Sequence, residues 1–405
     1  MKALFWILWA VALLFGLVGV YERLVTGHQL AAYGSYIPWG LWVALYVYFI
    51  GLSAGAFLLS TLVYVFHVKR LERIGKLSLF TALVALVAAL LVIWFDIGHM
   101  SRFWKVYTSF AWQSMMAWMV WLYTAYTILL VFELWFALRA DLIAWSARPG
   151  LSGGLARLLS FGKTDTSAAA LARDARVLRV LGSIGVPLAI AFHGGVGALF
   201  GVVGARPYWN SPLMPIIFLA SALASGGALL TFLVAFFWPA RSSEDHRELT
   251  YYLGRITLGL LALDILLEWA EFSINLYASI PAHAEAFRLI LFGQYWWVFW
   301  VVHLALGVLV PGLMLLLRGR SVACVGAASF LIAATFISVR LNIVLPGLAL
   351  PQLQGLERAY TDPRLSLSYF PSMMEWLVAL FVVTLGVGLF YAGYKLLPIT
   401  TAKEV

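Results

Sequence analysis

Ten stretches of about 20 consecutive, mostly apolar residues constrain the fold of this chain more than any other feature. A helix that crosses the hydrocarbon core of a bilayer, about 30 Å thick, needs about 20 such residues. Only 11% of the 405 residues are charged and 63% are hydrophobic, whereas a soluble domain carries about 25% charged residues. The sequence therefore predicts an all-α polytopic membrane protein and excludes a soluble enzyme, a disordered chain and a fibrous repeat. The expected spans are residues 3–20, 42–66, 77–95, 115–138, 180–203, 213–238, 252–277, 295–317, 322–345 and 376–397.

Cysteine content limits the redox chemistry that the chain can support alone. Cys324 is the single cysteine. A disulfide framework, a Cys-ligated iron–sulfur cluster and a thioether-attached haem all need more thiols. These groups are therefore excluded, and no metal site is expected.

Positive charges are distributed unevenly between the two sides of the expected spans. Ten spans put both termini on one side, and 19 of the 27 Lys and Arg residues fall on that side, Lys2 and Lys403 among them. Cytoplasmic loops are enriched in Lys and Arg, so both termini are expected in the cytoplasm, with the protein in the cell membrane of a bacterium or archaeon. The first span is interpreted as a retained anchor because no small-residue cleavage site follows it. The net charge of +9 therefore indicates topology rather than nucleic-acid binding.

The chain divides into four expected regions. Residues 53–59 and 224–230 have similar sequences rich in small residues, on helices that run in the same direction. They are either parts of two parallel four-helix repeats or small residues at packed helix interfaces. Loop 140–179 is expected to be a linker with a short amphipathic helix. The regions are an anchor helix and outer loop at 1–36, a first four-helix bundle at 37–204, a second at 205–345, and an outer loop, last helix and cytoplasmic tail at 346–405.

Three carboxylates lie inside one expected span. Asp264, Glu268 and Glu271 are spaced i, i+4, i+7, which places them along one helix face. Ionisable side chains at a bilayer centre cost at least about 2.5–3.5 kcal/mol each, so they usually have a function. The series is either a proton relay or a set of groups paired with neighbouring helices. Glu133, near the inner end of its span, is a weaker candidate for proton transfer.

Two histidines also lie within spans. His193 is flanked by glycines, and His303 lies in the eighth span at a similar depth. Their positions allow a bis-histidine haem b, although His67 and His99 lie too far apart in depth to ligate a second one. His303 is also a candidate for proton transfer.

Polar and aromatic residues gather at the outer ends of the spans. Imidazole and carboxylate groups can hydrogen-bond quinone oxygens and transfer their protons. The alternative is an aromatic belt with charges paired for stability. From the residues alone, a belt or packing role is the interpretation favoured for Tyr46, Tyr48, Trp296 and Trp297. The polar residues concerned are Asp96, His99, Arg102, Arg206, Arg340, Asn342, Tyr369 and Glu375.

Several motifs occur in an order that resembles the NrfD/polysulfide reductase (PsrC-like) membrane-subunit family over most of the chain. They are Trp39-Gly40, Asp96-Ile97-Gly98-His99, Arg206-Pro207-Tyr208-Trp209 and Tyr369-Phe370-Pro371 followed by Glu375-Trp376. The ten-helix length is similar to that of the longer branch, which includes HybB of a periplasmic uptake hydrogenase and DsrP of sulfite-reduction-associated complexes.

The resemblance implies two four-helix bundles, no haem, and a quinone site near the outer face of the first bundle. His193 stands where shorter members have a quinone-binding Tyr, and Asp96, His99, Arg102 and Arg206 would border the same pocket. Val43 and Tyr46 replace the Asn and His of shorter members, which changes the expected hydrogen bonds to the quinone; Tyr46 is included in the site. Arg340, Tyr369 and Glu375 are assigned to the outer face, as structural or site residues.

The expected function is that of the quinone-reactive membrane subunit of a respiratory oxidoreductase, with no redox centre of its own. The resemblance implies a docked multi-cluster iron–sulfur protein and a catalytic subunit, such as a molybdopterin enzyme or hydrogenase, or a cytochrome c. Menaquinone or ubiquinone would be the substrate, and turnover could drive proton translocation. A secondary transporter and a haem b anchor are the alternatives.

Overall fold

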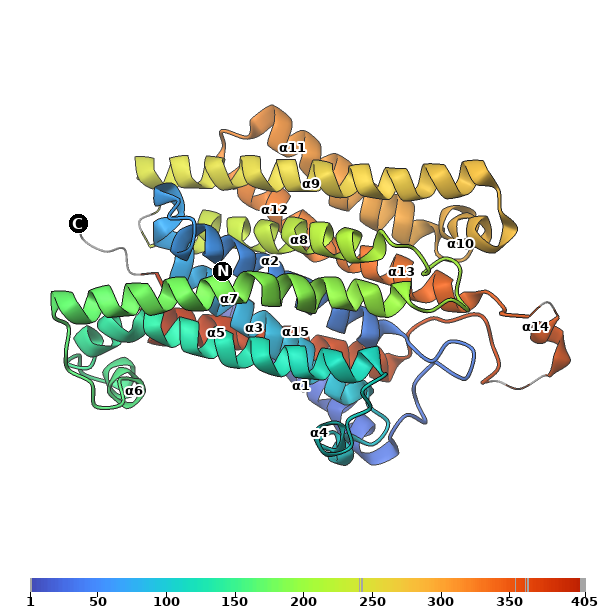
Figure 1. Ribbon diagram of the computed structural model, residues 1–405, viewed down its shortest axis with the longest axis horizontal. Coiled ribbons are helices and arrows are strands. Elements are labelled where there is room, and N and C mark those ends of the chain that lie inside the picture. The colour runs from blue at the N-terminus through green and yellow to red at the C-terminus, as the bar shows by residue number, and fades with distance from the viewer. Residues whose placement is uncertain are drawn as a thin grey trace.

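A computed structural model describes residues 2–239, 241, 243–353, 355–360, 362 and 364–400 (Figure 1). Every regular element in these residues is a helix, and none is a strand, which confirms the predicted all-α class. Lys403, with the rest of the expected tail beyond Thr400, lies outside the described residues, as does the side chain of Lys2.

Nine helices within the described residues are long and apolar enough to cross a membrane. Three of these spans contain an internal change of helix type or direction: η1 (Lys69–Ile74), a 3-10 helix, continues into α3, η3, a π-helix, continues into α11, and α12 continues into α13. The helices concerned are α1 (Lys2–Thr26), α2 (Leu41–Tyr64), α3 (Gly75–Asp96), α5 (Met115–Trp145), α7 (Ala168–Gly201), α8 (Met214–Phe237), η3 (Val298–Leu309) with α11 (Val310–Arg318), α12 (Val322–Thr335) with α13 (Ile337–Ala349), and α15 (Met373–Leu396).

The tenth expected span lies inside α9 (Glu244–Ala278), which is not among the nine. Eight charged residues along α9 lower its mean hydropathy. The helix nevertheless runs the length of the molecule and packs against α8 and α12 (Figure 1). A tenth crossing therefore remains a prediction.

Short helices occupy the connections between the long ones. The α6 helix lies in loop 140–179, where a short helix was expected, whereas α10 was not anticipated. These elements are η1 (Lys69–Ile74), η2 (Met100–Arg102), α4 (Lys105–Thr108), α6 (Leu151–Leu159), α10 (Pro281–Phe292) and α14 (Leu356–Ala359).

Serine residues define where several long helices begin. The side chains of Ser114, Ser167, Ser321 and Ser372 each accept a hydrogen bond from the backbone N–H three residues later. Such a cap satisfies one of the N–H groups that a helix leaves unpaired at its first turn. These caps explain why α5, α7, α12 and α15 begin where they do.

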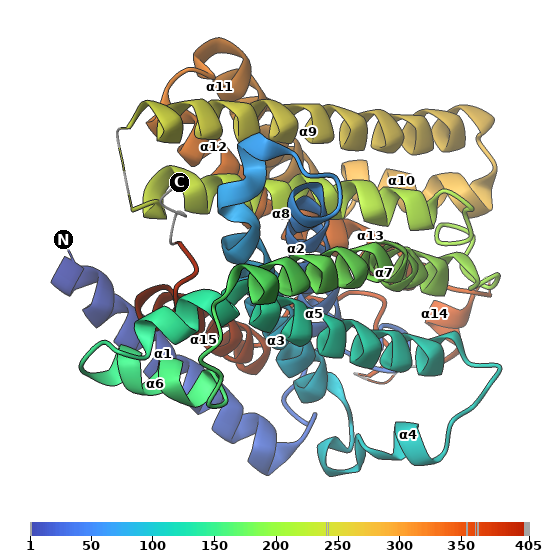
Figure 2. The same cartoon turned by 60° about the vertical axis from the view of Figure 1, so that its left-hand side comes forward.

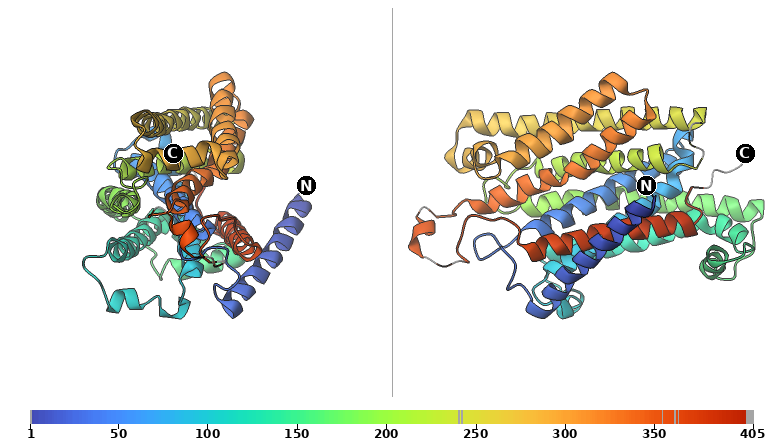
Figure 3. Two further views of the ribbon diagram at one scale, coloured as in Figure 1. Left: turned by 90° about the vertical axis from the view of Figure 1, so that its right-hand side faces the viewer. Right: turned by 180° about the vertical axis from the view of Figure 1, so that it is seen from behind.

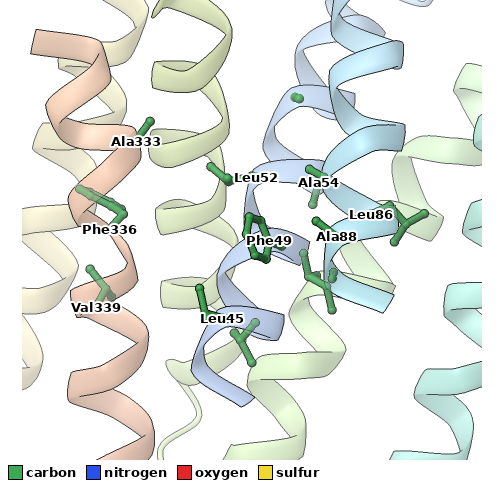
Figure 4. Close-up of a cluster of buried hydrophobic side chains, with 14 of the residues drawn as sticks. Leu45, Phe49, Leu52, Ala54, Leu86, Ala88, Ala333, Phe336 and Val339 are labelled. Carbon is green, nitrogen blue, oxygen red and sulfur yellow. The ribbon is translucent and has the colours of Figure 1, made fainter. Parts of the chain in front are cut away.

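Helix α2 occupies the centre of the molecule. It packs against α3, α8, α7 and α13, while α1 and α15 pack together at one side (Figure 3). Its apolar side chains face neighbours in several directions, as the cluster around Phe49 and Phe336 shows (Figure 4). A helix that is hydrophobic all round is a buried helix.

The beginning of α1 and the end of α15 lie toward the end of the molecule that carries α6 (Figure 2).

The tightest helix crossing joins the two small-residue motifs. A Cβ atom added at Gly226 of α8 would lie 2.7 Å from the Gly55 Cα and 2.7 Å from the Ala56 N of α2, and one added at Gly55 would clash with the Ala222 carbonyl oxygen. Glycine at both positions lets the two backbones touch. Interface packing is therefore sufficient to explain the similar motifs, and the repeat remains a prediction.

Alanine at the crossing should destabilise the fold. We expect Gly55→Ala or Gly226→Ala to cost about 1–3 kcal/mol, because an added Cβ forces two backbones apart. The thermal midpoint followed by tryptophan fluorescence should fall by several degrees. Gly386→Ala is the control, because nothing lies within 4 Å of its Cβ position. Equal midpoints for the crossing and control variants would contradict this interpretation.

Candidate functional site

The His193 imidazole lies completely buried in α7 and has one hydrogen-bond partner. Its Nε2 atom lies 2.7 Å from the carbonyl oxygen of Phe218 in α8. A carbonyl can only accept, so Nε2 carries the proton and Nδ1 of the neutral ring is an acceptor. The Nδ1 atom is buried and has no hydrogen-bond partner among the described residues. The fold therefore holds one imidazole nitrogen free to accept a hydrogen bond.

The Arg340 guanidinium lies beside this imidazole, although it comes from α13. It is 2% exposed, donates through Nη2 to the Ser221 hydroxyl, and its Cζ atom lies 4.6 Å from the centre of the Phe218 ring. The Nη1 atom is buried and lacks a partner among the described residues. A buried donor thus remains available close to the acceptor on His193.

Gly51 of α2 is where these two side chains meet. A Cβ atom on Gly51 would lie 3.5 Å from the His193 Cε1 and 3.4 Å from the Arg340 Nη2. The missing side chain gives both groups their space. We call this group of residues, His193, Arg340 and Gly51, the His193–Arg340 centre; it joins helices α2, α7, α8 and α13.

The α9 carboxylates extend from this centre. Asp264 is 4% exposed and interacts electrostatically with Arg340, Glu268 and His303. The Glu268 Oε2 lies 2.7 Å from the Nε2 of His303, which is in the π-helix η3. Glu271 accepts a hydrogen bond of 2.6 Å from the Ser211 hydroxyl. Two sets of residues that the sequence assigned to different sites are therefore connected through Arg340 and Asp264.

Glu133 stands apart from this series. It is completely buried in α5, and neither carboxylate oxygen has a hydrogen-bond partner among the described residues. The position of Gly182 in α7 provides its space, since a Cβ there would lie 3.6 Å from Oε1. A carboxyl group buried without partners is costly, so a functional role is favoured over a packing role.

Asp96 lies in a separate cluster at the C-terminal end of α3. It accepts a hydrogen bond of 3.2 Å from the Tyr33 hydroxyl. The guanidinium of Arg23 lies beside it and donates to the carbonyls of Phe95, at 2.7 Å, and Ile97, at 2.9 Å. Burial and the Asp96 carboxylate raise the pKa of Tyr33. No hydrogen bond, ion pair or ring contact in the described residues connects this cluster to His193.

The other residues expected around a quinone are also dispersed. His99 and Arg102 are exposed in the turn after α3. Arg206 donates to the Leu350 carbonyl at 2.7 Å, and partial burial lowers its pKa. The Tyr46 ring lies 5.7 Å from that of Tyr123 inside the first half of the chain. The single pocket expected from the resemblance is thus not assembled by direct contacts.

Glu375 connects three segments at the beginning of α15. Its Oε2 accepts from the backbone N–H groups of Ala32 and Ser372, each at 2.9 Å, and its Oε1 accepts from the Tyr369 hydroxyl. That hydroxyl accepts from the Leu41 N–H at 2.7 Å. Burial and the neighbouring Glu375 carboxylate raise the pKa of Tyr369. Of the two roles expected for this motif, these contacts favour the structural one.

One buried ion pair was not anticipated from the sequence. Arg139 of α5 and Asp174 of α7 meet at 2.5 Å and are both nearly inaccessible. The sequence around Arg139 and Asp174 carries no motif that predicts the pair, so only the packing of α5 against α7 reveals it.

No group of three His, Cys, Asp or Glu side chains in the described part of the chain could hold a metal ion.

Together, these features define a class: a polytopic helical membrane protein with a buried ionisable centre between its helices. The family model described as polysulphide reductase, NrfD, matches residues 29–352. The chain belongs to this family, which confirms the resemblance.

Three relatives cover nearly the whole chain. It is 38% identical to a protein of Mesobacillus selenatarsenatis that is named as a subunit of selenate reductase, over 100% of this chain and 96% of the relative. It is 27% identical to the "Hdr-like menaquinol oxidoreductase integral membrane subunit" of Archaeoglobus fulgidus, over 94% of this chain and 90% of the relative. It is 25% identical to the "Menaquinone reductase, integral membrane subunit" of Nitratidesulfovibrio vulgaris, over 95% of this chain and 88% of the relative. The relatives are thus named as subunits of larger oxidoreductases.

Glu375→Gln should weaken the end of the fold at which α15 begins. The amide nitrogen cannot accept, so at least one buried donor loses its partner, at about 1–3 kcal/mol. We expect a lower thermal midpoint and faster proteolysis between residues 350 and 372. Thr384→Val, which removes a hydroxyl from the middle of the same helix, is the control. An unchanged midpoint combined with a raised KM for quinol would indicate a site role instead.

Proposed function

We propose that this protein is the integral membrane subunit of a quinol-linked oxidoreductase. It exchanges electrons between the membrane quinone pool and a docked iron–sulfur subunit, which passes them to or from a catalytic subunit. Family membership supports the membrane-subunit role, and the names of two relatives, which refer to menaquinol and menaquinone, favour menaquinone as the pool. The chain supplies no redox centre in this scheme.

The observation that carries the proposal is the pair of unpartnered nitrogens at the His193–Arg340 centre. A quinol hydroxyl is both a donor and an acceptor. His193 Nδ1 accepts its proton, and Arg340 Nη1 donates to the same oxygen, which becomes negative as the proton leaves. Oxidation of the quinol to quinone releases two protons to protein groups and two electrons to the partner's cluster. We therefore assign the headgroup to this centre rather than to the cluster around Asp96.

The released protons need a route through the membrane interior. Asp264 lies next along the series from Arg340, followed by the Glu268–His303 pair and then Glu271 toward the outer end. Each group can accept and pass on a proton, so the series conducts protons while the centre turns over. Glu133 provides a second proton-accepting group in the first half of the chain.

Topology and assembly follow from the same scheme. Helices α2, α3, α5 and α7 form one four-helix bundle, and α8, α9, η3 with α11, and α12 with α13 form the second, with α9 as a tenth crossing. Both termini lie in the cytoplasm. The iron–sulfur partner docks at the opposite end, where Asp96, His99, Arg102 and Arg206 lie. The contacts between neighbouring helices support this grouping.

The haem b alternative receives less support from the histidines. Nε2 of His193 is engaged by the Phe218 carbonyl, and Nε2 of His303 by the Glu268 carboxylate. Ligation of iron through these atoms would break both interactions. The quinone proposal uses the nitrogens that are free.

His193→Ala should reduce quinol oxidation by the assembled complex. Loss of a general base costs about 10²–10⁴-fold in rate, and kcat/KM for a menaquinol analogue reports it. His246→Ala is a matched control, because His246 is also buried and also contacts a backbone carbonyl of α8, that of Val234 at 3.0 Å. We expect the control complex to assemble and to remain within about threefold of wild type, a margin well below the general-base effect. If both variants assemble and keep equal activity, the site assignment is wrong.

Glu268→Gln should separate proton movement from electron transfer. The amide keeps a hydrogen-bonding group beside His303 but cannot carry a proton. We expect fewer protons released per electron in proteoliposomes, with electron transfer restored by an uncoupler. The control is Glu248→Gln, which changes an exposed carboxylate on the same helix. An unchanged proton-to-electron ratio would show that Glu268 has only a structural role.

A further inference from the structure

A basic cleft opens at the end of the molecule that the charge asymmetry assigns to the cytoplasm. It has a volume of about 600 Å³ and is lined by residues of α9, the end of α11 and the turn that leads into α12. Three arginines, Arg255, Arg318 and Arg320, line it, and no acidic residue does. We call this the Arg318 cleft.

The arginines of this cleft are uncompensated. All three are exposed, and their side chains make no hydrogen bond or ion pair with any other residue that the structure describes. The basic residues nearby behave differently, since Arg73 pairs with Asp245 at 2.8 Å and Arg247 with Glu244 at 3.7 Å. Asp245 and Glu244 therefore pair with other cations, and the lining of the Arg318 cleft itself carries only positive charge.

A second cleft adjoins the first, and both basic and acidic side chains line it, the acidic ones being Glu244, Asp245 and Glu248. It has a volume of about 650 Å³, shares Tyr251, Arg255 and Arg320 with the first, and extends to the turn between α2 and α3. That turn adds Lys69 and Arg70. Lys69 makes no ion pair with another described residue, and the Arg70 guanidinium lies over the Tyr252 ring at 5.6 Å.

Apolar side chains border the arginines. Leu316 and Leu317 line the Arg318 cleft and are 66% and 79% exposed. A soluble anion would gain nothing from these leucines. A ligand with an anionic head and apolar chains would match both parts, because basic pockets between membrane helices on the cytoplasmic side bind anionic headgroups.

We propose that the Arg318 cleft binds an anionic phospholipid, with its phosphodiester among Arg255, Arg318 and Arg320 and its acyl chains along Leu316 and Leu317. This site is independent of the quinone proposal. The bound phospholipid contacts both α9 and α11 and so stabilises the position of α9, the helix that carries Asp264 and Glu268.

The test compares lipids and arginine variants on the full chain in neutral detergent. Wild type and the triple variant Arg255→Gln, Arg318→Gln, Arg320→Gln are titrated with phosphatidylglycerol, phosphatidylcholine or inorganic phosphate. Bound lipid is counted by native mass spectrometry, and stability is followed by the thermal midpoint. The control variant Arg148→Gln, Arg173→Gln, Arg176→Gln loses the same charge from exposed positions at the same end.

Phosphatidylglycerol should bind wild type and the control variant and raise their thermal midpoints. Each interfacial arginine contributes about 1 kcal/mol, or about fivefold in affinity, so the triple variant should bind about 100-fold more weakly. Equal affinity of the triple and control variants, or equal affinity for phosphatidylglycerol and phosphatidylcholine, would overturn the proposal. An equal effect of inorganic phosphate would overturn the lipid assignment. The single variant Arg318→Gln, with an expected fivefold loss, decides the outcome if the triple variant fails to fold.

Discussion

Contact between the backbones of α2 and α8 at Gly55 and Gly226 is the constraint on which the rest of the structure depends. Association of helices within a membrane relies on close packing, since lipid is as apolar as the helix surface. The crossing brings the two halves of the chain together along their central helices. Gly51 lies one turn before Gly55, so the same contact directs His193 from one half and Arg340 from the other toward a common point.

The polar groups inside this fold divide into compensated and uncompensated ones. Glu268 pairs with His303, Glu271 with Ser211, and Arg139 with Asp174. These pairs offset part of the cost of removing charge from water. Unpartnered buried atoms remain on His193, Arg340 and Glu133, on the paired residues Arg139, Asp174 and His303, and on His28, Tyr123, Ser329 and Asn342. Buried polar groups are nearly always satisfied in folded proteins, so these exceptions are candidates for binding a substrate or a transferred proton. We propose this role for His193 and Arg340 because their two free nitrogens belong to side chains that meet at Gly51.

Hydropathy predicted most of the fold, since the length of an apolar stretch is a local property of the sequence. Nine of the ten expected spans correspond to helices of sufficient length and hydropathy in the described residues. The stretch in α9 behaves differently because its carboxylates, which made it functionally interesting, also lower its hydropathy. The short helix α10 was missed because it lies in a connection between two expected spans and is too short to resemble a span itself.

The site was less predictable, because the sequence does not state which helices are neighbours. His193 was identified from its position beside glycines, but Arg340 was assigned to the outer face. Its contact with the Ser221 hydroxyl of α8 depends on α13 packing against α2. Asp96 was grouped with His193 through the resemblance, yet its partner is Tyr33, in the loop before α2. Residue types indicated the chemistry, and tertiary packing decided which residues act together.

The location of the quinone headgroup is the central claim, and photolabelling tests it most directly. The assembled complex would be irradiated with a photoreactive menaquinone analogue, and the labelled peptides identified by mass spectrometry, with and without excess menaquinone. We expect labels that excess menaquinone suppresses to lie in α7 around His193, in α8 between residues 218 and 222, or in α13 around Arg340. Competed labels confined to residues 96–102 and the loop that contains Tyr33 would contradict it.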